Sequence, residues 1–154
     1  MEREQGHDGG CLCGAVRYRV RGPTTWAAVC YCDSCTRASG GVAVAWAGFK
    51  STNFRIVKGS LAVFESTPGV RRGFCAHCGT SLTYQKDAAK LPGASDDVYV
   101  TTRTLDDANA FPPEEHVLYG ERVRWLNVAD ERPHHERLSA KYAHLQLESV
   151  TKRD

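Results

Sequence analysis

The chain has 154 residues, of which 42% are hydrophobic and 25% charged, and its formal net charge at pH 7 is +2. This length is enough for one globular domain with its own hydrophobic core. The small net charge does not predict binding to nucleic acid. The longest apolar run, residues 42–49, is too short to cross a bilayer, and the N-terminus lacks the apolar core of a signal peptide. We therefore expect no membrane partner and a location in the reducing cytoplasm, where thiols stay free.

The first third of the chain predicts short strands. Residues 1–8 are polar and are expected to be flexible. Residues 15–20 alternate apolar with charged side chains, the pattern of a half-buried strand, and residues 26–30 predict a second strand. Residues 31–41 are expected to form a loop at the end of that strand, and residues 42–49, rich in valine and aromatic residues, predict a buried strand.

The strand pattern continues, with turn residues between the strands, through residues 54–57, 61–64, 71–74, 80–84, 98–101 and 116–119. The polar segment 85–97 is expected to be a surface loop over or near the functional site. From Pro133 the apolar residues recur near helical spacing, so residues 134–154 are predicted to be a helical C-terminal extension. We therefore predict an all-β domain over residues 9–133, with stacked antiparallel sheets of short strands and a C-terminal helix.

The seven cysteines form three groups: Cys11 with Cys13, then Cys30, Cys32 and Cys35, then Cys75 with Cys78. An odd number cannot all pair in intrachain disulfides, whereas one closed zinc site of four thiolates and one open site of three would use all of them. The Cys75 pair, followed by Gly79, predicts a zinc knuckle, a tight turn that needs a second pair of ligands. Cys11 and Cys13 are the remaining pair, so these four residues are assigned to a closed structural site.

The triplet Cys30, Cys32 and Cys35 is then left with an open coordination position, as in a catalytic zinc site. Two other interpretations stay open for it. A histidine or an aspartate elsewhere in the chain would complete a second structural site, or the three thiols would form a redox relay.

The residues around all three groups resemble the glutathione-dependent formaldehyde-activating enzyme and centromere protein V family. The resemblance lies in residues 10–18, 30–35 with 39–40, and 72–80, and in shorter pieces at 104–107, 113–116, 130 and 133. It implies an all-β fold with two zinc ions, structural at Cys11, Cys13, Cys75 and Cys78 and catalytic at Cys30, Cys32 and Cys35. It also implies carbon–sulfur lyase activity, and the centromere protein V branch leaves a non-catalytic, zinc-stabilised binding module as the alternative.

A zinc ion with three thiolate ligands carries a formal charge of −1, so it is a weaker Lewis acid than a three-histidine site and is better suited to holding a substrate thiolate. The sequence therefore favours activation of a thiol such as glutathione for addition to an aldehyde such as formaldehyde, or the reverse cleavage. The expected partner is this small thiol–aldehyde adduct. Nothing in the pattern predicts an oligomeric state.

Three polar residues are candidates for the substrate pocket. Arg37 and Arg72 are candidates to bind a carboxylate of the thiol, and Ser39 begins a turn that presents backbone amides to an anion. For each, an ordinary solvated surface role is the alternative.

Other polar residues near the motifs have structural alternatives too. Asp33 is a candidate catalytic base, or else an ordinary loop residue. His116 is a candidate to support a metal ligand, or else a residue packed in a strand. His77 is expected at the surface, Asp106 in a turn, and His134 with His135 at a solvated helix start.

Overall fold

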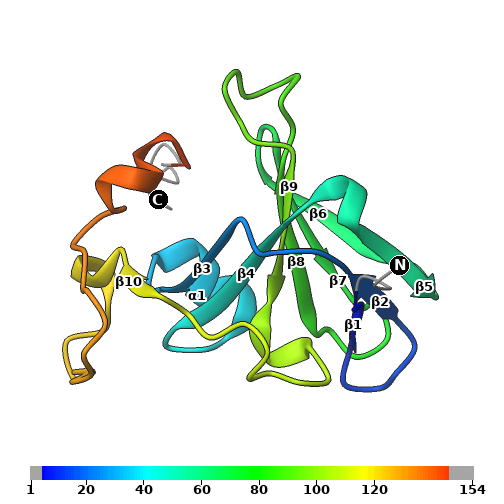
Figure 1. The fold of residues 1–154 in the computed structure, drawn as a ribbon, viewed down its shortest axis with the longest axis horizontal. Helices are drawn as coiled ribbons and strands as arrows, with labels where there is room; N and C mark the ends of the chain where they lie inside the picture. Colours follow the sequence, from blue (N-terminus) through cyan, green and yellow to red (C-terminus); the bar gives the residue numbers. More distant parts are fainter. Residues whose placement is uncertain (1–4, 146–154) are drawn as a thin grey trace.

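The computed structural model describes residues 5–145 and contains two β-sheets. A three-stranded sheet has the order β1-β2-β5, and a seven-stranded sheet has the order β10-β3-β4-β9-β8-β7-β6. Figure 1 shows the small sheet at one end of the molecule and β10, with the C-terminal segment, at the other. The strands are β1 (His7–Gly10), β2 (Arg17–Val20), β3 (Trp26–Cys30), β4 (Val44–Lys50), β5 (Phe54–Lys58), β6 (Ala62–Thr67), β7 (Val70–Phe74), β8 (Ser81–Lys86), β9 (Asp97–Thr101) and β10 (Glu115–Val117).

The all-β prediction is confirmed, and every strand expected from the sequence is present with boundaries shifted by up to three residues. Strand β1 was missed because its sequence, HDGG, has no apolar alternation; it pairs with β2 and begins within the segment expected to be flexible. The sheets are not wholly antiparallel, because β10 pairs in parallel with β3. This pairing follows from the long connection between the two strands, which returns the chain in the same direction.

The large sheet has a different hydrophobic core on each face. Along β4, Ala47 and Phe49 contribute to one core, whereas Val44 and Trp46 contribute to the other. Successive side chains of a strand point to opposite faces, and the apolar run of β4 therefore reflects burial on both sides.

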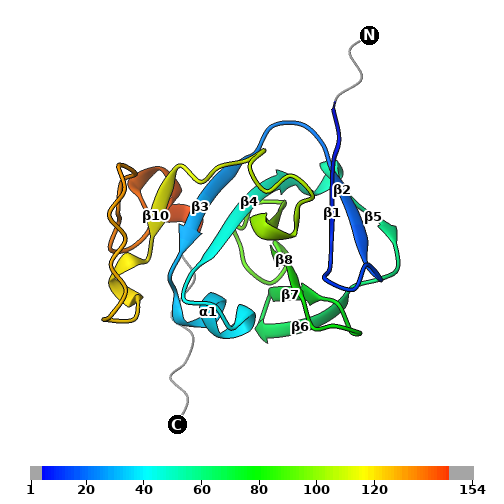
Figure 2. The same cartoon turned by 90° about the horizontal axis from the view of Figure 1, so that it is seen from below.

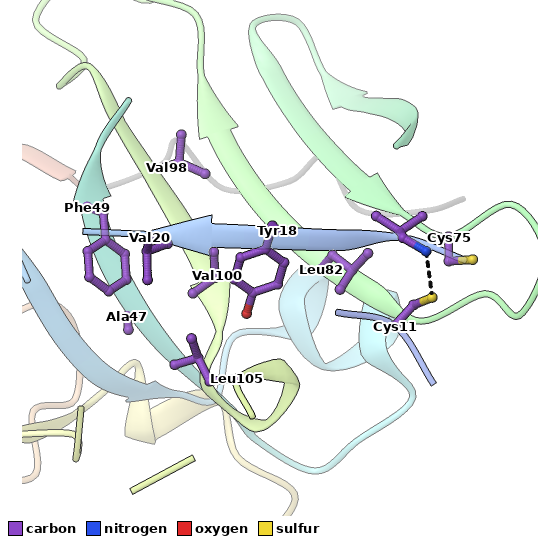
Figure 3. Packing of buried hydrophobic residues seen from close by; sticks show 11 residues of the cluster. Cys11, Tyr18, Val20, Ala47, Phe49, Cys75, Leu82, Val98, Val100 and Leu105 are labelled. Atoms are coloured by element: carbon purple, nitrogen blue, oxygen red, sulfur yellow. Dashed lines mark hydrogen bonds between the residues drawn. The ribbon is translucent and has the colours of Figure 1, made fainter. Parts of the chain in front are cut away.

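The first core lies between the two sheets. Tyr18 and Val20 of the small sheet pack with Phe49, Val98 and Val100 of the large one, and all are fully buried or nearly so. Figure 3 shows that Cys11 and Cys75 lie at one end of this cluster. The first and third cysteine groups therefore belong to the main core of the domain.

The second core holds the cysteine triplet. Cys30, Cys32 and Cys35 pack in one cluster with aromatic residues of the central strands, among them Trp46 and Tyr84. Leu91, in the segment between β8 and β9, packs against the same cluster. The expectation that this loop lies near the site is consistent with this packing.

The loop expected after β3 is instead a short helix, α1 (Asp33–Ser39), which Figure 2 shows beneath β3 and β4. Cys32 is its N-cap, and its sulfur accepts a hydrogen bond from the backbone nitrogen of Cys35 at 3.3 Å. Gly40 ends the helix with φ of 72°. The sequence does contain two helix signals here, an Asp33–Arg37 pair at i,i+4 spacing and the terminal Gly40. The prediction of a loop followed from the cysteine spacing and did not use them.

The α-helix predicted from Pro133 is not present in the part of the chain that the structure describes. His134 instead forms a parallel bridge with His116, and the backbone nitrogen of His116 donates to the carbonyl of Pro133 at 2.8 Å. A 3-10 helix follows only at Ala140–Leu145, and the rest of the predicted helix lies outside the described residues. Hydrogen bonds to the backbone of β10 satisfy the polar groups of this segment and favour an extended conformation over the weakly predicted helix. Within residues 5–145, no helix is both long and apolar enough to span a membrane.

Candidate metal centres

Four cysteines from two distant parts of the chain meet at one end of the main core. The sulfurs of Cys11, Cys13, Cys75 and Cys78 all lie within 4.8 Å of one another. The Cys11–Cys13 and Cys13–Cys75 sulfur distances are 3.6 and 3.8 Å. Thiolates about 2.3 Å from a tetrahedral zinc are about 3.8 Å apart, so this set of donors fits a closed zinc site.

Two tight turns place these sulfurs. Gly14 and Gly79 follow the second cysteine of their pairs with φ of 78° and 75°, a conformation that glycine adopts without steric cost. The backbone nitrogen of Val16 donates to the Cys11 sulfur at 3.2 Å, the bond drawn in Figure 3. Amide donors of this kind favour the thiolate, the form in which cysteine binds metal.

The turns are also tied to each other. Thr80 Oγ1 accepts from the backbone nitrogen of Leu12 and lies 3.1 Å from the Cys78 sulfur. Hydrogen bonds from the Thr80 side chain and backbone lower the pKa of Cys78 to about 5. One residue therefore joins the two cysteine pairs and promotes ionisation of a ligand.

The triplet is built on the end of β3 and the first turn of α1. The sulfurs of Cys30, Cys32 and Cys35 lie within 4.8 Å of one another, and all three residues are buried. Among the described residues, no histidine, aspartate or glutamate joins these three donors. The donor set therefore fits a zinc ion that keeps one coordination position for another molecule.

The three thiols do not ionise alike. Hydrogen bonds from Cys30 and Cys35 lower the pKa of Cys32 to about 2. The pKa of Cys30 is raised by its hydrogen bonds to Cys32 and Cys35 and by burial. The hydrogen bond from Cys30 lowers the pKa of Cys35, but its bond to Cys32 and burial prevail and raise it to about 11. Without metal, the triplet therefore holds its negative charge on Cys32.

Comparison with known proteins identifies the family of this chain. The family model described as "Glutathione-dependent formaldehyde-activating enzyme" matches residues 6–121, which contain all seven cysteines. The chain belongs to this family. A curated Halomonas elongata protein named "Putative glutathione-dependent formaldehyde-activating enzyme" is 28% identical over 133 residues, covering 79% of this chain and 80% of the relative.

A solved structure of a Rhodobacter sphaeroides protein has the same fold, with a TM-score of 0.53 and 23% identity. The match covers 67% of this chain and 91% of the other. The family resemblance seen in the sequence is therefore confirmed, and the likeness of the solved structure concerns the fold.

The candidate pocket residues of this family member occupy different environments. Arg72 is buried, with its Nη1 3.7 Å from the Cys35 sulfur and its Nε donating to Ser66 Oγ at 3.1 Å. Arg37 instead forms an exposed ion pair with Asp33 at 2.8 Å. Ser39 Oγ donates to the carbonyl of Thr36 and accepts from the backbone nitrogen of Gly41 at the helix end. Of the three candidates, the structure brings only Arg72 into contact with the triplet.

The histidine interpretations are corrected in part. His77 is exposed, as expected. His134 and His135 do not start a solvated helix. The His134 ring stacks on His116 at 4.2 Å, and His135 lies 3.2 Å from Glu115. Asp106 pairs with Arg17 at 2.9 Å, a contact in addition to its turn position.

Sequence reasoning gave no role to two side chains beside the triplet, Tyr84 and Tyr31. Tyr84, on β8, belongs to the core that holds it. Tyr31 lies between two cysteines of the triplet, and its hydroxyl is hydrogen-bonded to His116. Nε2 of the same histidine lies 3.0 Å from Asp130. Asp130 and His116 stood within the family resemblance, but nothing in the sequence distinguishes Tyr84 from other strand aromatics.

Proposed function

We propose that this protein is a zinc-dependent carbon–sulfur lyase that catalyses the reversible addition of a small thiol, such as glutathione, to an aldehyde such as formaldehyde. The observation that carries the proposal is the different number of cysteines in the two clusters. Four thiols meet at the edge of the main core, whereas only three meet in the second core, with no further described donor among them. A closed site suits a structural ion, and a site one ligand short suits a reactive one.

The substrate class follows from the chemistry of the triplet and from the family. A zinc ion held by Cys30, Cys32 and Cys35 would supply a position at which a thiol loses its proton and remains nucleophilic. The name of the Halomonas elongata relative refers to glutathione and formaldehyde, which agrees with this chemistry.

Residues of the chain adapt the second core to this reaction. Arg72 brings a positive charge to 3.7 Å from the Cys35 sulfur, where it offsets the charge of three thiolates and an incoming fourth. The aromatic residues of the core exclude water, and electrostatic interactions in such a site are stronger than in solution. Since none of the seven cysteines forms a disulfide, we place the protein in a reducing compartment, the cytoplasm.

Zinc content and activity in a Cys32→Ala variant test the proposal. We expect two zinc ions in the wild type and one in the variant. The variant should also lose at least 100-fold in the rate of thiol–aldehyde exchange, measured by exchange NMR above the uncatalysed background.

The matched control is Arg19→Ala, which removes an ion pair with Asp8 in the small sheet and should keep both zinc ions and full activity. Full activity of Cys32→Ala with one zinc lost would refute the proposal. A wild type without activity on any thiol–aldehyde adduct would instead favour the binding module.

A further inference from the structure

Three side chains form a row across the face of the sheet that carries the triplet. Arg72 on β7 is the register partner of Tyr84 on β8, and Tyr84 is the partner of Tyr99 on β9. The Arg72 guanidinium lies 5.0 Å from the centre of the Tyr84 ring, and the same guanidinium contacts the sulfur of Cys35. Figure 2 shows β7 and β8 near α1, the helix that carries Cys35. Arg72 therefore contacts both Tyr84 and a cysteine of the triplet.

The Tyr84 hydroxyl has no hydrogen-bond partner although it is buried. Tyr84 is 8% exposed, and its oxygen is one of three buried side-chain polar atoms without a partner among the described residues. The other two, on Thr102 and His134, are outside the core that holds the triplet. Burial of an unpaired hydroxyl destabilises a fold, so phenylalanine would suit this position better if packing were the only requirement.

The other polar groups of the row already have partners. Arg72 donates to Ser66 and contacts Cys35, and the Tyr99 hydroxyl lies 3.2 Å from Ser95 Oγ. Within this row, the Tyr84 hydroxyl is the buried side-chain polar group that has no hydrogen-bond partner among the described residues.

Burial raises the pKa of Tyr84 above its ordinary value. Its hydroxyl therefore stays protonated at neutral pH, as a hydrogen-bond donor must.

We propose that the Tyr84 hydroxyl binds the aldehyde oxygen of the substrate and protonates it during addition of the thiol, an inference that rests on the function proposed above. As the sulfur–carbon bond forms, the π pair of the carbonyl moves to oxygen, which takes the tyrosine proton. The proton released by the thiol restores the tyrosine, so the net reaction converts thiol and aldehyde to the hemithioacetal. The reverse reaction breaks the same carbon–sulfur bond.

A Tyr84→Phe variant tests this role because it removes the hydroxyl and keeps the ring. We expect kcat for thiol–aldehyde exchange to fall about 100-fold, in the range found when one donor to a developing oxyanion is removed. Binding of the thiol alone, measured by calorimetry, should not change, because the hydroxyl meets the aldehyde and not the sulfur. The zinc content should stay the same, and the melting temperature should be unchanged or higher.

The matched control is Tyr18→Phe, which removes a buried hydroxyl of the small sheet, in the core on the other side of the large sheet from Tyr84. That hydroxyl lies 2.8 Å from Thr104 Oγ1, so its removal should lower the melting temperature and leave kcat unchanged.

An active wild type with an equally active Tyr84→Phe variant overturns the inference and leaves the proposed function standing. Loss of zinc or a lower melting temperature in Tyr84→Phe also overturns it, by showing a structural role. An inactive wild type overturns both proposals together.

Discussion

The phenol oxygen of Tyr31 lies 2.8 Å from Nδ1 of His116, and this bond joins the segment between two triplet cysteines to strand β10. His116 is buried, and its Nε2 lies 3.0 Å from the Asp130 carboxylate, which also pairs with Arg132. The sequence makes His116 a candidate to support a ligand or to pack in a strand. The structure places it on β10, where it contacts Tyr31 between two triplet cysteines.

Replacement of Tyr31 by phenylalanine should destabilise the protein by about 1 to 3 kcal/mol, because Nδ1 of His116 is left buried and unpaired. Urea denaturation of the zinc-loaded protein measures this loss. The half-buried Tyr119 is the control, since its hydroxyl accepts one bond from the backbone of Val128 and Tyr119→Phe should cost less than about 1 kcal/mol.

A double-mutant cycle between Tyr31→Phe and His116→Phe should show a coupling free energy of more than about 0.5 kcal/mol. Additive effects of the two substitutions would mean that the bond contributes nothing to stability.

The two cysteine clusters should differ in their effect on the fold. Cys75 is fully buried in the main core, so Cys75→Ser should remove one zinc and lower the free energy of unfolding by more than about 3 kcal/mol. Cys32→Ser should also remove one zinc, yet it should cost less than about 2 kcal/mol, because Cys32 is the N-cap of α1 and serine is a favourable residue at that position. Thermal unfolding with parallel metal analysis compares them, and equal losses would contradict a division into a structural and a reactive site.

Metal binding to the triplet should release protons. At pH 7 the lowered pKa of Cys32 leaves it ionised, whereas the raised pKa values of Cys30 and Cys35 keep both thiols protonated. Zinc binds thiolates, so two protons should leave, and the apparent affinity should fall about 100-fold for each pH unit below neutrality.

Calorimetric titration of the second zinc equivalent, in buffers of different ionisation enthalpy, counts these protons, because the closed site with four ligands fills first. Release of one proton or fewer, or of three, would show that the charge is distributed differently among the three thiols. Cys30→Ala serves as the comparison and should reduce the count by one.

Local patterns in the sequence were sufficient for every strand except β1 and for the grouping of the cysteines. Alternation at 15–20 predicted β2 because a strand exposes its two faces in turn, and that property depends only on near neighbours. Helix α1 was also encoded locally, by the spacing of Asp33 and Arg37 and by Gly40, but the cysteine pattern led to a loop being expected there.

Short segments of the sequence specify the supply of ligands, two close pairs and a triplet of thiols, each next to a turn or strand end, because ligand spacing and turn chemistry are local properties. The side chains that surround these thiols are set by the tertiary fold. The register of β7, β8 and β9 puts Arg72 and Tyr84 beside the triplet. At the β10 edge, His134 forms a β-bridge with His116, where the sequence had predicted a helix. Such contacts depend on strand pairing between segments far apart in the chain, which no local pattern specifies.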